Sequence, residues 1–193
     1  MDDKILGEIT PHLLSQRPST YHLSKALAEQ LLAEQKEGLP VAIVRPSIIV
    51  GAMREPSNGW IDNYNGLTGY LVAVGKGVLR TLHCKPNFKC DIIPVDIVVN
   101  TCLSSAYFVA TKRPEMPFVV NCVSGPLNGV TWRQINAICI PLLCATPSEQ
   151  LFRVPGVSLH SSSWVHFCHL VVEHKIPAFV VDLLFRAFGL KPM

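Results

Sequence analysis

The sequence has few of the features that mark a nucleic-acid-binding or disulfide-stabilised protein. Charged residues make up 16% of the 193 positions, the net charge is +3, and the basic residues are scattered without a Lys/Arg tract. Nucleic acid is therefore not indicated as a partner. The seven cysteines are odd in number and include no Cys-x-x-Cys spacing. We therefore expect reduced thiols in a cytosol-facing protein, and neither a disulfide framework nor a zinc site.

We also expect neither a secretion signal nor a membrane span in this sequence. The chain opens on acidic residues, where a signal peptide is basic and then apolar. No apolar run reaches the ~20 residues that a membrane span needs. Residues 164–190 come closest, but Pro177 would kink this stretch, and it is interrupted by His166, His169, Glu173, His174, Lys175, Asp182 and Arg186. We expect a helical segment with polar edges that can lie on a membrane surface, rather than a set of metal ligands or a span.

What the sequence does contain is apolar. Hydrophobic residues account for 49% of the positions, and the mean hydropathy is +0.30. This places the chain at the apolar end of soluble proteins. We expect a buried sheet, or contact with a membrane or an apolar ligand.

The sequence is organised around a helix that starts at Ser19 and runs to about Lys36. Tyr21 and Lys25 are four residues apart, so they project from the same face one turn apart. A neighbouring ammonium favours the phenolate and so lowers the pKa of a tyrosine toward neutral pH. Such a tyrosine can give its proton to a carbonyl oxygen as a general acid. Chance alone also produces such pairs, so the context has to decide. Leucines on two sides of this helix predict that it is buried.

Strands and helices alternate after this helix. Residues 41–45 read as an inner strand of a parallel sheet, which ends or bends at Arg45-Pro46-Ser47, so residues 46–51 would line a site at its carboxyl end. We further expect a helix over 66–77, a strand turning into a helix over 90–110, and a strand over 118–122. A helix should start at Trp132 and break or kink at Pro141. A helical tail should occupy residues 160–190.

Two local features of this part of the chain carry more specific expectations. Asp96 stands at the start of the helix over 95–110, where it can cap the helix or place a negative charge in its first turn, and we expect capping. The turn-rich stretch 52–66 holds Trp60 and Tyr64. It is either a substrate loop or a surface loop that these two aromatic side chains pin in place.

Together these residues resemble a known superfamily and one family within it. The Tyr21/Lys25 pair, the Arg-Pro-Ser strand end, the turn at 94–96 and the strand end at 121–125 are similar to extended short-chain dehydrogenases/reductases. The closer resemblance is to the alcohol-forming fatty acyl-CoA reductases, and it rests on Arg17–Tyr21, Lys25–Glu29, Val44–Ile48, Glu55-Pro56, Gly59–Asn63, Gly75–Gly77 and His174–Phe179.

The resemblance implies a function and a fold. Such enzymes reduce long-chain fatty acyl-CoA with NADPH to a primary fatty alcohol. Tyr21 and Lys25 would be the catalytic residues, and Lys25 would also hold the nicotinamide ribose. Pro46, Ser47 and Ile48 would lie beside the nicotinamide. The implied fold class is α/β: the C-terminal part of a Rossmann-like doubly wound parallel sheet in residues 1–146, followed by a mainly helical substrate region in 147–193.

The resemblance also implies parts that the sequence does not hold. Family members place a Gly-rich strand-turn-helix upstream of the tyrosine helix to hold the cofactor pyrophosphate. No Gly-x-Gly-x-x-Gly spacing follows a strand in this chain. We therefore expect an internal fragment of a longer protein that is inactive or nearly so alone. By resemblance the full protein would be membrane-associated and cytosol-facing, at the peroxisome or the endoplasmic reticulum.

Two other hypotheses remain open. One is an extended dehydrogenase/reductase that acts on sugar nucleotides, against which the Gly59-Trp60-Ile61 loop argues. The other is a non-catalytic truncated product that binds acyl chains, a membrane surface or a full-length partner through its apolar face and the 164–190 tail.

Overall fold

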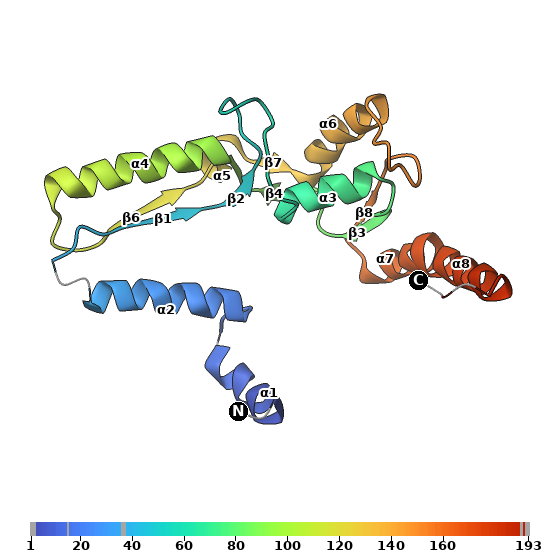
Figure 1. Cartoon of the computed structure of the whole chain (residues 1–193), viewed down its shortest axis with the longest axis horizontal. Helices are drawn as coiled ribbons and strands as arrows, with labels where there is room; N and C mark the ends of the chain where they lie inside the picture. Colours follow the sequence, from blue (N-terminus) through green and yellow to red (C-terminus); the bar gives the residue numbers. More distant parts are fainter. Residues whose placement is uncertain (1–2, 15, 36–37, 190, 192–193) are drawn as a thin grey trace. The chain divides into compact units, whose positions relative to one another are not determined.

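The computed structural model describes residues 3–14, 16–35, 38–189 and 191, and the chain divides into two compact units. Unit 1 comprises residues 1–45 and 99–122, and unit 2 comprises residues 46–98 and 123–193. Both units combine helices with short strands (Figure 1). The predicted α/β class is therefore confirmed.

Unit 1 is built on one pair of strands and the helix that precedes the second of them. β1 (Ala42–Pro46) pairs with β6 (Phe118–Cys122), and the arrows of the two strands point the same way in Figure 1. Helix α4 (Val95–Lys112) precedes β6 and packs on it, because the rings of Phe108 and Phe118 lie 4.6 Å apart. Two parallel strands connected through a helix form a βαβ unit, from which doubly wound sheets are assembled.

Two helices precede β1 in the chain. The sequence predicts a short helix within the first 17 residues and a second one from Ser19, and the structure has α1 (Asp3–Leu14) and α2 (Thr20–Gln35). The prediction that the second helix is buried on two sides is wrong for this structure. Leu27 and Leu31 are 50% and 52% exposed, because the described part of the chain places no apolar layer over them.

Unit 2 contains three further pairs of short strands. β2 and β5 are parallel, β3 and β8 are parallel, and β4 and β7 are antiparallel. Ile48 lies opposite Ile92 in the first pair. The strands are β2 (Ile48–Val50), β3 (Thr81–His83), β4 (Lys89–Cys90), β5 (Ile92–Pro94), β7 (Val130–Thr131) and β8 (Ser158–His160).

The core of unit 2 lies under two helices, α3 (Gly66–Gly75) and α6 (Trp132–Ala145). Its buried centre comprises Leu67 of α3, Cys90 of β4 and Ile135 of α6. The short helix α5 (Gly125–Asn128) lies between β6 and β7 in the chain. Burial of these apolar side chains, which belong to segments far apart in the sequence, holds unit 2 together.

Helix α6 begins as the sequence predicts. Thr131 is the N-cap, and its side-chain oxygen accepts a hydrogen bond from the backbone N–H of Gln134. The Gln134 side chain in turn accepts from the backbone N–H of Thr131, which completes a capping box. The sequence predicts a break or a kink at Pro141. The break does not occur, since α6 continues through Pro141 to Ala145, and the kink stays a prediction.

The C-terminal part of unit 2 is helical, as predicted. Helix α7 (Ser163–Leu170) passes through a π-helical turn, η1 (Val171–Lys175), into α8 (Ile176–Ala187). Pro177 lies in the first turn of α8. A proline lacks the N–H for an α-helical hydrogen bond and clashes with the carbonyl four residues earlier. The widened turn before it therefore accommodates Pro177 without ending the helical course.

The doubly wound sheet itself stays a prediction. Across the described residues each sheet has two strands. Within the same residues, no helix combines the length and the apolar character that crossing a lipid bilayer requires. The division into a reductase domain over residues 1–146 and a helical region over 147–193 stays a prediction.

Candidate functional site

Tyr21 and Lys25 lie together on the first turns of α2, within unit 1. The Lys25 Nζ is 5.6 Å from the centre of the Tyr21 ring, and Tyr21 is 64% exposed. The ring of His22 meets the Tyr21 ring edge-on at 5.7 Å, and the Ser24 hydroxyl donates to the Tyr21 carbonyl at 2.9 Å. The helix therefore presents a phenol and an ammonium side by side on a surface that a ligand can reach.

The same helix is tied to the end of β1 by an ion pair that the sequence analysis did not anticipate. The Arg45 guanidinium donates two hydrogen bonds to the two carboxylate oxygens of Glu29. These hydrogen bonds lower the pKa of Glu29 and raise the pKa of Arg45. Both residues belong to segments that carry the family resemblance, but nothing in a local pattern shows that they pair. The contact links α2 to the strand end that leads into Pro46.

Pro46, Ser47 and Ile48 connect β1 to β2. The Ile48 N–H donates to the Asp91 carbonyl at 3.1 Å. The Ser47 hydroxyl is buried next to the Asp91 carboxylate, but it makes no hydrogen bond of regular geometry. A buried hydroxyl of this kind is available to a polar ligand group. Tyr21 and Lys25 belong to unit 1 and these three residues to unit 2, so the structure shows each group in its own unit.

Asp91 is a residue that the sequence analysis did not single out. Its carboxylate accepts hydrogen bonds from the backbone N–H groups of Ser124 and Gly125, both at 3.0 Å. These bonds, with that of Ser124 the strongest influence, lower the pKa of Asp91. A Cβ on Gly125 would lie 2.7 Å from a carboxylate oxygen, so only glycine fits this turn without a shift. Within unit 2, Ser124 and Gly125 are thereby held against Asp91, the residue before β5.

The sequence predicts that Asp96 caps α4. In the structure Asp96 lies in the first turn of α4, and its carboxylate mainly binds another segment. Its carboxylate accepts hydrogen bonds from the backbone N–H groups of Met53 at 3.0 Å, Arg54 at 2.9 Å and Glu55 at 3.4 Å. These bonds, that of Met53 first, lower the pKa of Asp96. The carboxylate also accepts from the N–H of Ile97 in the first turn of α4. Asp96 therefore anchors a loop that is distant in the sequence, and a local helix-start pattern cannot reveal such a contact.

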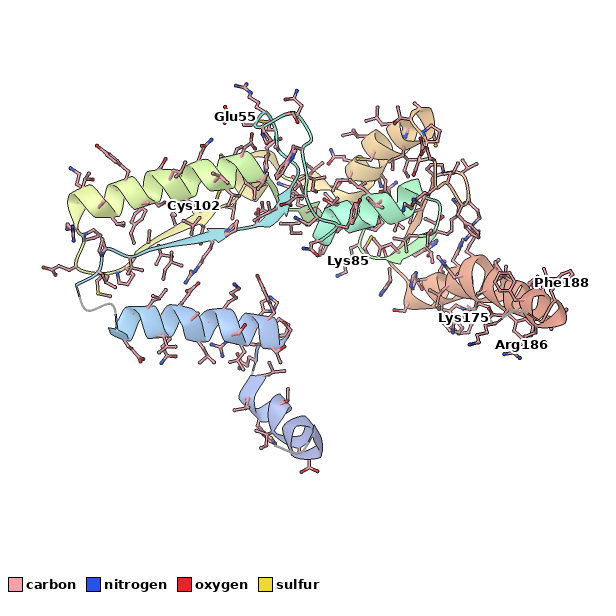
Figure 2. The ribbon with its side chains drawn as sticks, in the orientation of Figure 1. Glu55, Lys85, Cys102, Lys175, Arg186 and Phe188 are labelled. Carbon is pink, nitrogen blue, oxygen red and sulfur yellow. The ribbon has the colours of Figure 1, made fainter. Side chains whose placement is uncertain are left out.

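The loop over 52–66 is held mainly by its backbone. The Ala52 N–H donates to the Trp60 carbonyl at 3.0 Å, and the Gly59 N–H donates to the Ala52 carbonyl at 2.7 Å. Trp60 and Tyr64 are 42% and 75% exposed. Tyr64 is therefore largely open to solvent, and the expectation that the two aromatic side chains pin the loop stays a prediction. The substrate-loop interpretation stays a prediction, and Figure 2 shows the Glu55 side chain on this loop.

Histidines of the segment over 166–174 form hydrogen bonds with Arg80 and Thr81, which are distant in the sequence. His166 Nδ1 pairs with the Thr81 hydroxyl at 3.0 Å, and His174 Nε2 accepts from the Arg80 N–H at 3.3 Å. Among the residues that the structure describes, no three His, Cys, Asp or Glu side chains are grouped to hold a metal ion. All seven cysteines are free thiols.

The arrangement at the start of α2 can support proton transfer to an oxygen. A phenol hydroxyl is a general acid, and an adjacent ammonium stabilises the phenolate that remains after transfer. A lysine ammonium also has three N–H donors, so it can bind a hydroxyl at the same time. The assignment of Tyr21, Lys25, Pro46, Ser47 and Ile48 to a nicotinamide cofactor stays a prediction.

Comparison with known proteins places this chain in a family. Residues 1–102 match the sequence profile of an NAD-binding domain family described as male sterility protein. Over 192 residues the chain is 42% identical to proteins named fatty acyl-CoA reductase 1 from Mus musculus and from Homo sapiens. It is 38% identical to fatty acyl-CoA reductase 2 from Mus musculus. In each case the match covers 100% of this chain and 37% of the relative.

Proposed function

The chain belongs to the male sterility protein family of NAD-binding domains, and on that premise we propose that it contributes to the reduction of long-chain fatty acyl-CoA to a primary fatty alcohol with NADPH. The observation that carries the proposal is the 42% identity to fatty acyl-CoA reductase 1, which extends over the whole chain. The chain spans 37% of the length of these relatives. The proposed activity is therefore that of a protein of their full length.

In this proposal Tyr21 is the general acid. When bound, one NADPH would supply a hydride to the acyl carbon in the first reduction, and a second NADPH would supply one to the aldehyde carbon in the second. The Tyr21 hydroxyl hydrogen-bonds the oxygen on which negative charge develops. In the first reduction the CoA thiolate leaves and an aldehyde forms. In the second reduction the aldehyde oxygen takes the proton of Tyr21 and becomes the alcohol oxygen, and solvent then restores the Tyr21 proton.

Lys25 and the strand-end residues position the reactants in the same proposal. The Lys25 ammonium, with its three N–H donors, would bind ribose hydroxyls of the cofactor. The Ser47 hydroxyl would bind a polar group of the nicotinamide, with Pro46 and Ile48 against the ring. The support from the structure is the 5.6 Å separation of Lys25 Nζ from the Tyr21 ring centre and the unsatisfied buried hydroxyl of Ser47.

The proposal is tested in a chimaera. This chain replaces the matching segment of mouse fatty acyl-CoA reductase 1, and oxidation of NADPH is followed with hexadecanoyl-CoA. Tyr21→Phe keeps the ring and removes the proton, so we expect turnover to fall at least a hundredfold, within the range of general acid catalysis. Tyr107→Phe is the matched control, because Tyr107 is 74% exposed on α4. If the folded Tyr21→Phe chimaera retains the turnover of the unsubstituted one, Tyr21 is not the acid.

A second candidate concerns the membrane. Helix α8 carries the exposed apolar side chains of Phe179 (68% exposed) and Leu183 (57%) one turn apart, and Phe188 (78%) follows its last residue. Lys175 and Arg186 lie on the same helical segment, and Figure 2 shows these two side chains together with Phe188. An amphipathic helix of this kind binds an anionic bilayer surface. This supports contact of residues 164–190 with a membrane.

The membrane candidate agrees with a membrane-associated, cytosol-facing placement at the peroxisome or the endoplasmic reticulum. An alternative substrate class, the sugar nucleotides, is separated from fatty acyl-CoA by the same chimaera. A chimaera that oxidises its cofactor with hexadecanoyl-CoA and does not turn over a uridine-diphosphate sugar supports the acyl substrate. The opposite preference supports the sugar-nucleotide alternative.

A further inference from the structure

Glu29 lies on the same face of α2 as Tyr21 and Lys25. The three residues follow one another at intervals of four, so one helical turn separates each from the next. The positions three or four residues away from Lys25 hold Tyr21, His22, Ala28 and Glu29. Within one turn of the Lys25 ammonium, the only carboxylate that α2 offers is therefore that of Glu29.

A carboxylate at this position competes for the ammonium. A lysine and a glutamate four positions apart on a helix form an ion pair. The paired ammonium would have fewer free N–H donors, and the negative charge beside it would offset its effect on the neighbouring phenol. The other acidic residue of α2, Glu34, lies nine positions from Lys25 on the opposite side of the helix, where it accepts from Gln30 at 2.8 Å. Glu29 is therefore the residue of α2 that has to be kept away from Lys25.

Glu29 is turned toward Arg45 of β1 instead. Arg45 Nε donates to one carboxylate oxygen of Glu29 at 2.9 Å, and Arg45 Nη2 donates to the other. Such a two-point contact uses both oxygens and fixes the direction of the carboxylate. Lys25 takes part in no ion pair among the described residues, and its Nζ lies over the Tyr21 ring, 5.6 Å from the ring centre. The guanidinium thus occupies the carboxylate that could otherwise bind the ammonium.

The pair of Glu29 and Arg45 is exposed, which limits its effect on stability. The side chain of Arg45 is 51% exposed and that of Glu29 is 31% exposed. Water screens an exposed pair, and holding two long side chains in one geometry costs rotamer freedom, so such pairs contribute little to folding. The pair therefore matters more for where the Glu29 charge lies than for the stability of unit 1.

We propose that Arg45 and Glu29 are positioning residues: by holding the Glu29 carboxylate, Arg45 keeps the Lys25 ammonium free for a ligand at the start of α2. Neither residue touches the reacting atoms. That the ligand is a ribose of the nicotinamide cofactor rests on the proposed function. The free ammonium does not, because it is a property of the folded chain alone. Loss of Arg45 should therefore be harmful only while the Glu29 carboxylate is present.

A single and a double variant separate this role from a structural one. Arg45→Gln removes the cation and releases the Glu29 carboxylate to pair with Lys25. Glu29→Gln together with Arg45→Gln also removes the contact between α2 and β1, but it leaves no carboxylate beside Lys25. A pair that only fastened α2 to β1 would be lost equally in both variants. A pair that restrains Glu29 predicts a defect in the single variant and recovery in the double variant.

The first measurement needs neither cofactor nor turnover. A water-soluble carbodiimide activates a carboxylate, and a lysine amine within reach displaces the carbodiimide group as a urea and forms an amide. Mass spectrometry of the purified chain detects an amide between Lys25 and Glu29 as the loss of one water from the peptide that holds both residues. We expect its yield to rise about threefold or more in Arg45→Gln, because the released carboxylate lies one turn from Lys25. Lys112→Gln, which removes an exposed cation at the end of α4, is the control and should leave the yield unchanged.

The second measurement uses the chimaera of this chain with mouse fatty acyl-CoA reductase 1. Binding of NADPH is titrated without acyl-CoA. Exposed ion pairs correspond to factors of about two to five in an equilibrium constant, so the dissociation constant should rise by about that much in Arg45→Gln. It should return to the unsubstituted value in the double variant. The proposal is overturned if the double variant binds NADPH as weakly as Arg45→Gln, or if the amide yield in Arg45→Gln equals that of the unsubstituted chain.

A second substitution covers a loss of folding. If Arg45→Gln has lost its native circular dichroism, Arg45→Met replaces it in both measurements. Methionine keeps a long apolar stem at this position and carries no charge, so it releases Glu29 while it preserves the packing that the arginine stem provides. The expected results and the refutations are the same.

The reductase proposal fails separately. A raised amide yield in Arg45→Gln, in a chain whose chimaera shows no Tyr21-dependent turnover, would reject the reductase and keep the role of Arg45 toward Lys25. An active chimaera, combined with equal amide yields in Arg45→Gln and the unsubstituted chain, would reject the role of Arg45 alone.

Discussion

The Tyr70 hydroxyl donates a hydrogen bond to the Asn136 side-chain oxygen at 2.6 Å, and this bond offers a direct test of how α3 and α6 are held together. Tyr70→Phe removes the hydroxyl and keeps the ring, which packs edge-on against Trp132 with ring centres 5.5 Å apart. Asn136 is 8% exposed, so water does not readily replace the lost donor at its side-chain oxygen. Leaving a buried acceptor unsatisfied costs about 1–3 kcal/mol. We expect the free energy of unfolding of unit 2 to fall by about 2 kcal/mol.

The assay is urea unfolding at pH 7.5, followed by tryptophan fluorescence. Trp132 lies next to Tyr70, and all three tryptophans belong to unit 2. With a slope of about 2 kcal/mol per molar urea, the midpoint should fall by about 1 M. Tyr107→Phe, at an exposed position, should leave it unchanged. In a double-mutant cycle with Asn136→Ala, a coupling energy near zero would refute the reasoning, because partners in a hydrogen bond couple by about 0.5–3 kcal/mol.

The same pair predicts a pH dependence. Burial raises the pKa of Tyr70 in the folded protein, against a smaller opposing influence of the Asn136 hydrogen bond. The unfolded chain releases this proton near pH 10, before the folded protein does. The contribution of Tyr70 is therefore complete below pH 10 and is lost as pH rises through its folded pKa. The difference in stability between the unsubstituted protein and Tyr70→Phe should shrink above pH 10, and a constant difference would contradict this account.

Two further outcomes are expected. Phe179→Asp together with Leu183→Asp should abolish sedimentation of the chain with vesicles containing one-third phosphatidylserine, because the apolar face of α8 is lost. Leu127→Asp, at a 92% exposed position elsewhere, is the control. Retention of the double variant on vesicles would count against membrane contact. Burial and then Arg153 lower the pKa of His174, so its contribution to stability is present above about pH 6.5 and is lost as pH falls through the lowered pKa. His174→Gln should flatten the melting temperature between pH 5 and 7, and an unchanged slope would show that His174 does not cause it.

The elements of the fold were predictable where local signals determine them. Periodicity, β-branched composition and helix-start signals predict the helix that carries Tyr21 and Lys25, the strand over 118–122 and the helix that starts at Trp132. These signals act within a few residues. A helix start and the spacing of two side chains one turn apart are therefore readable without tertiary information.

The long-range contacts could not be predicted in the same way. Asp96 has the local signature of a helix-capping residue, but its carboxylate holds backbone groups 41–43 positions away. Asp91 and Gly125 are 34 positions apart, and the pair Glu29–Arg45 is 16 positions apart. The partner of such a side chain depends on which strands lie next to each other, and a single sequence pattern does not contain that information.

The π-helical turn at residues 171–175 also acts as a register element within the C-terminal helices. A π-helical turn is equivalent to one residue inserted into an α-helix, and one residue corresponds to about 100° of rotation. The direction in which the side chains of α8 point, relative to those of α7, is therefore set by this single extra position. Removing one residue there would keep the composition of the apolar face and turn it toward a different side of the molecule.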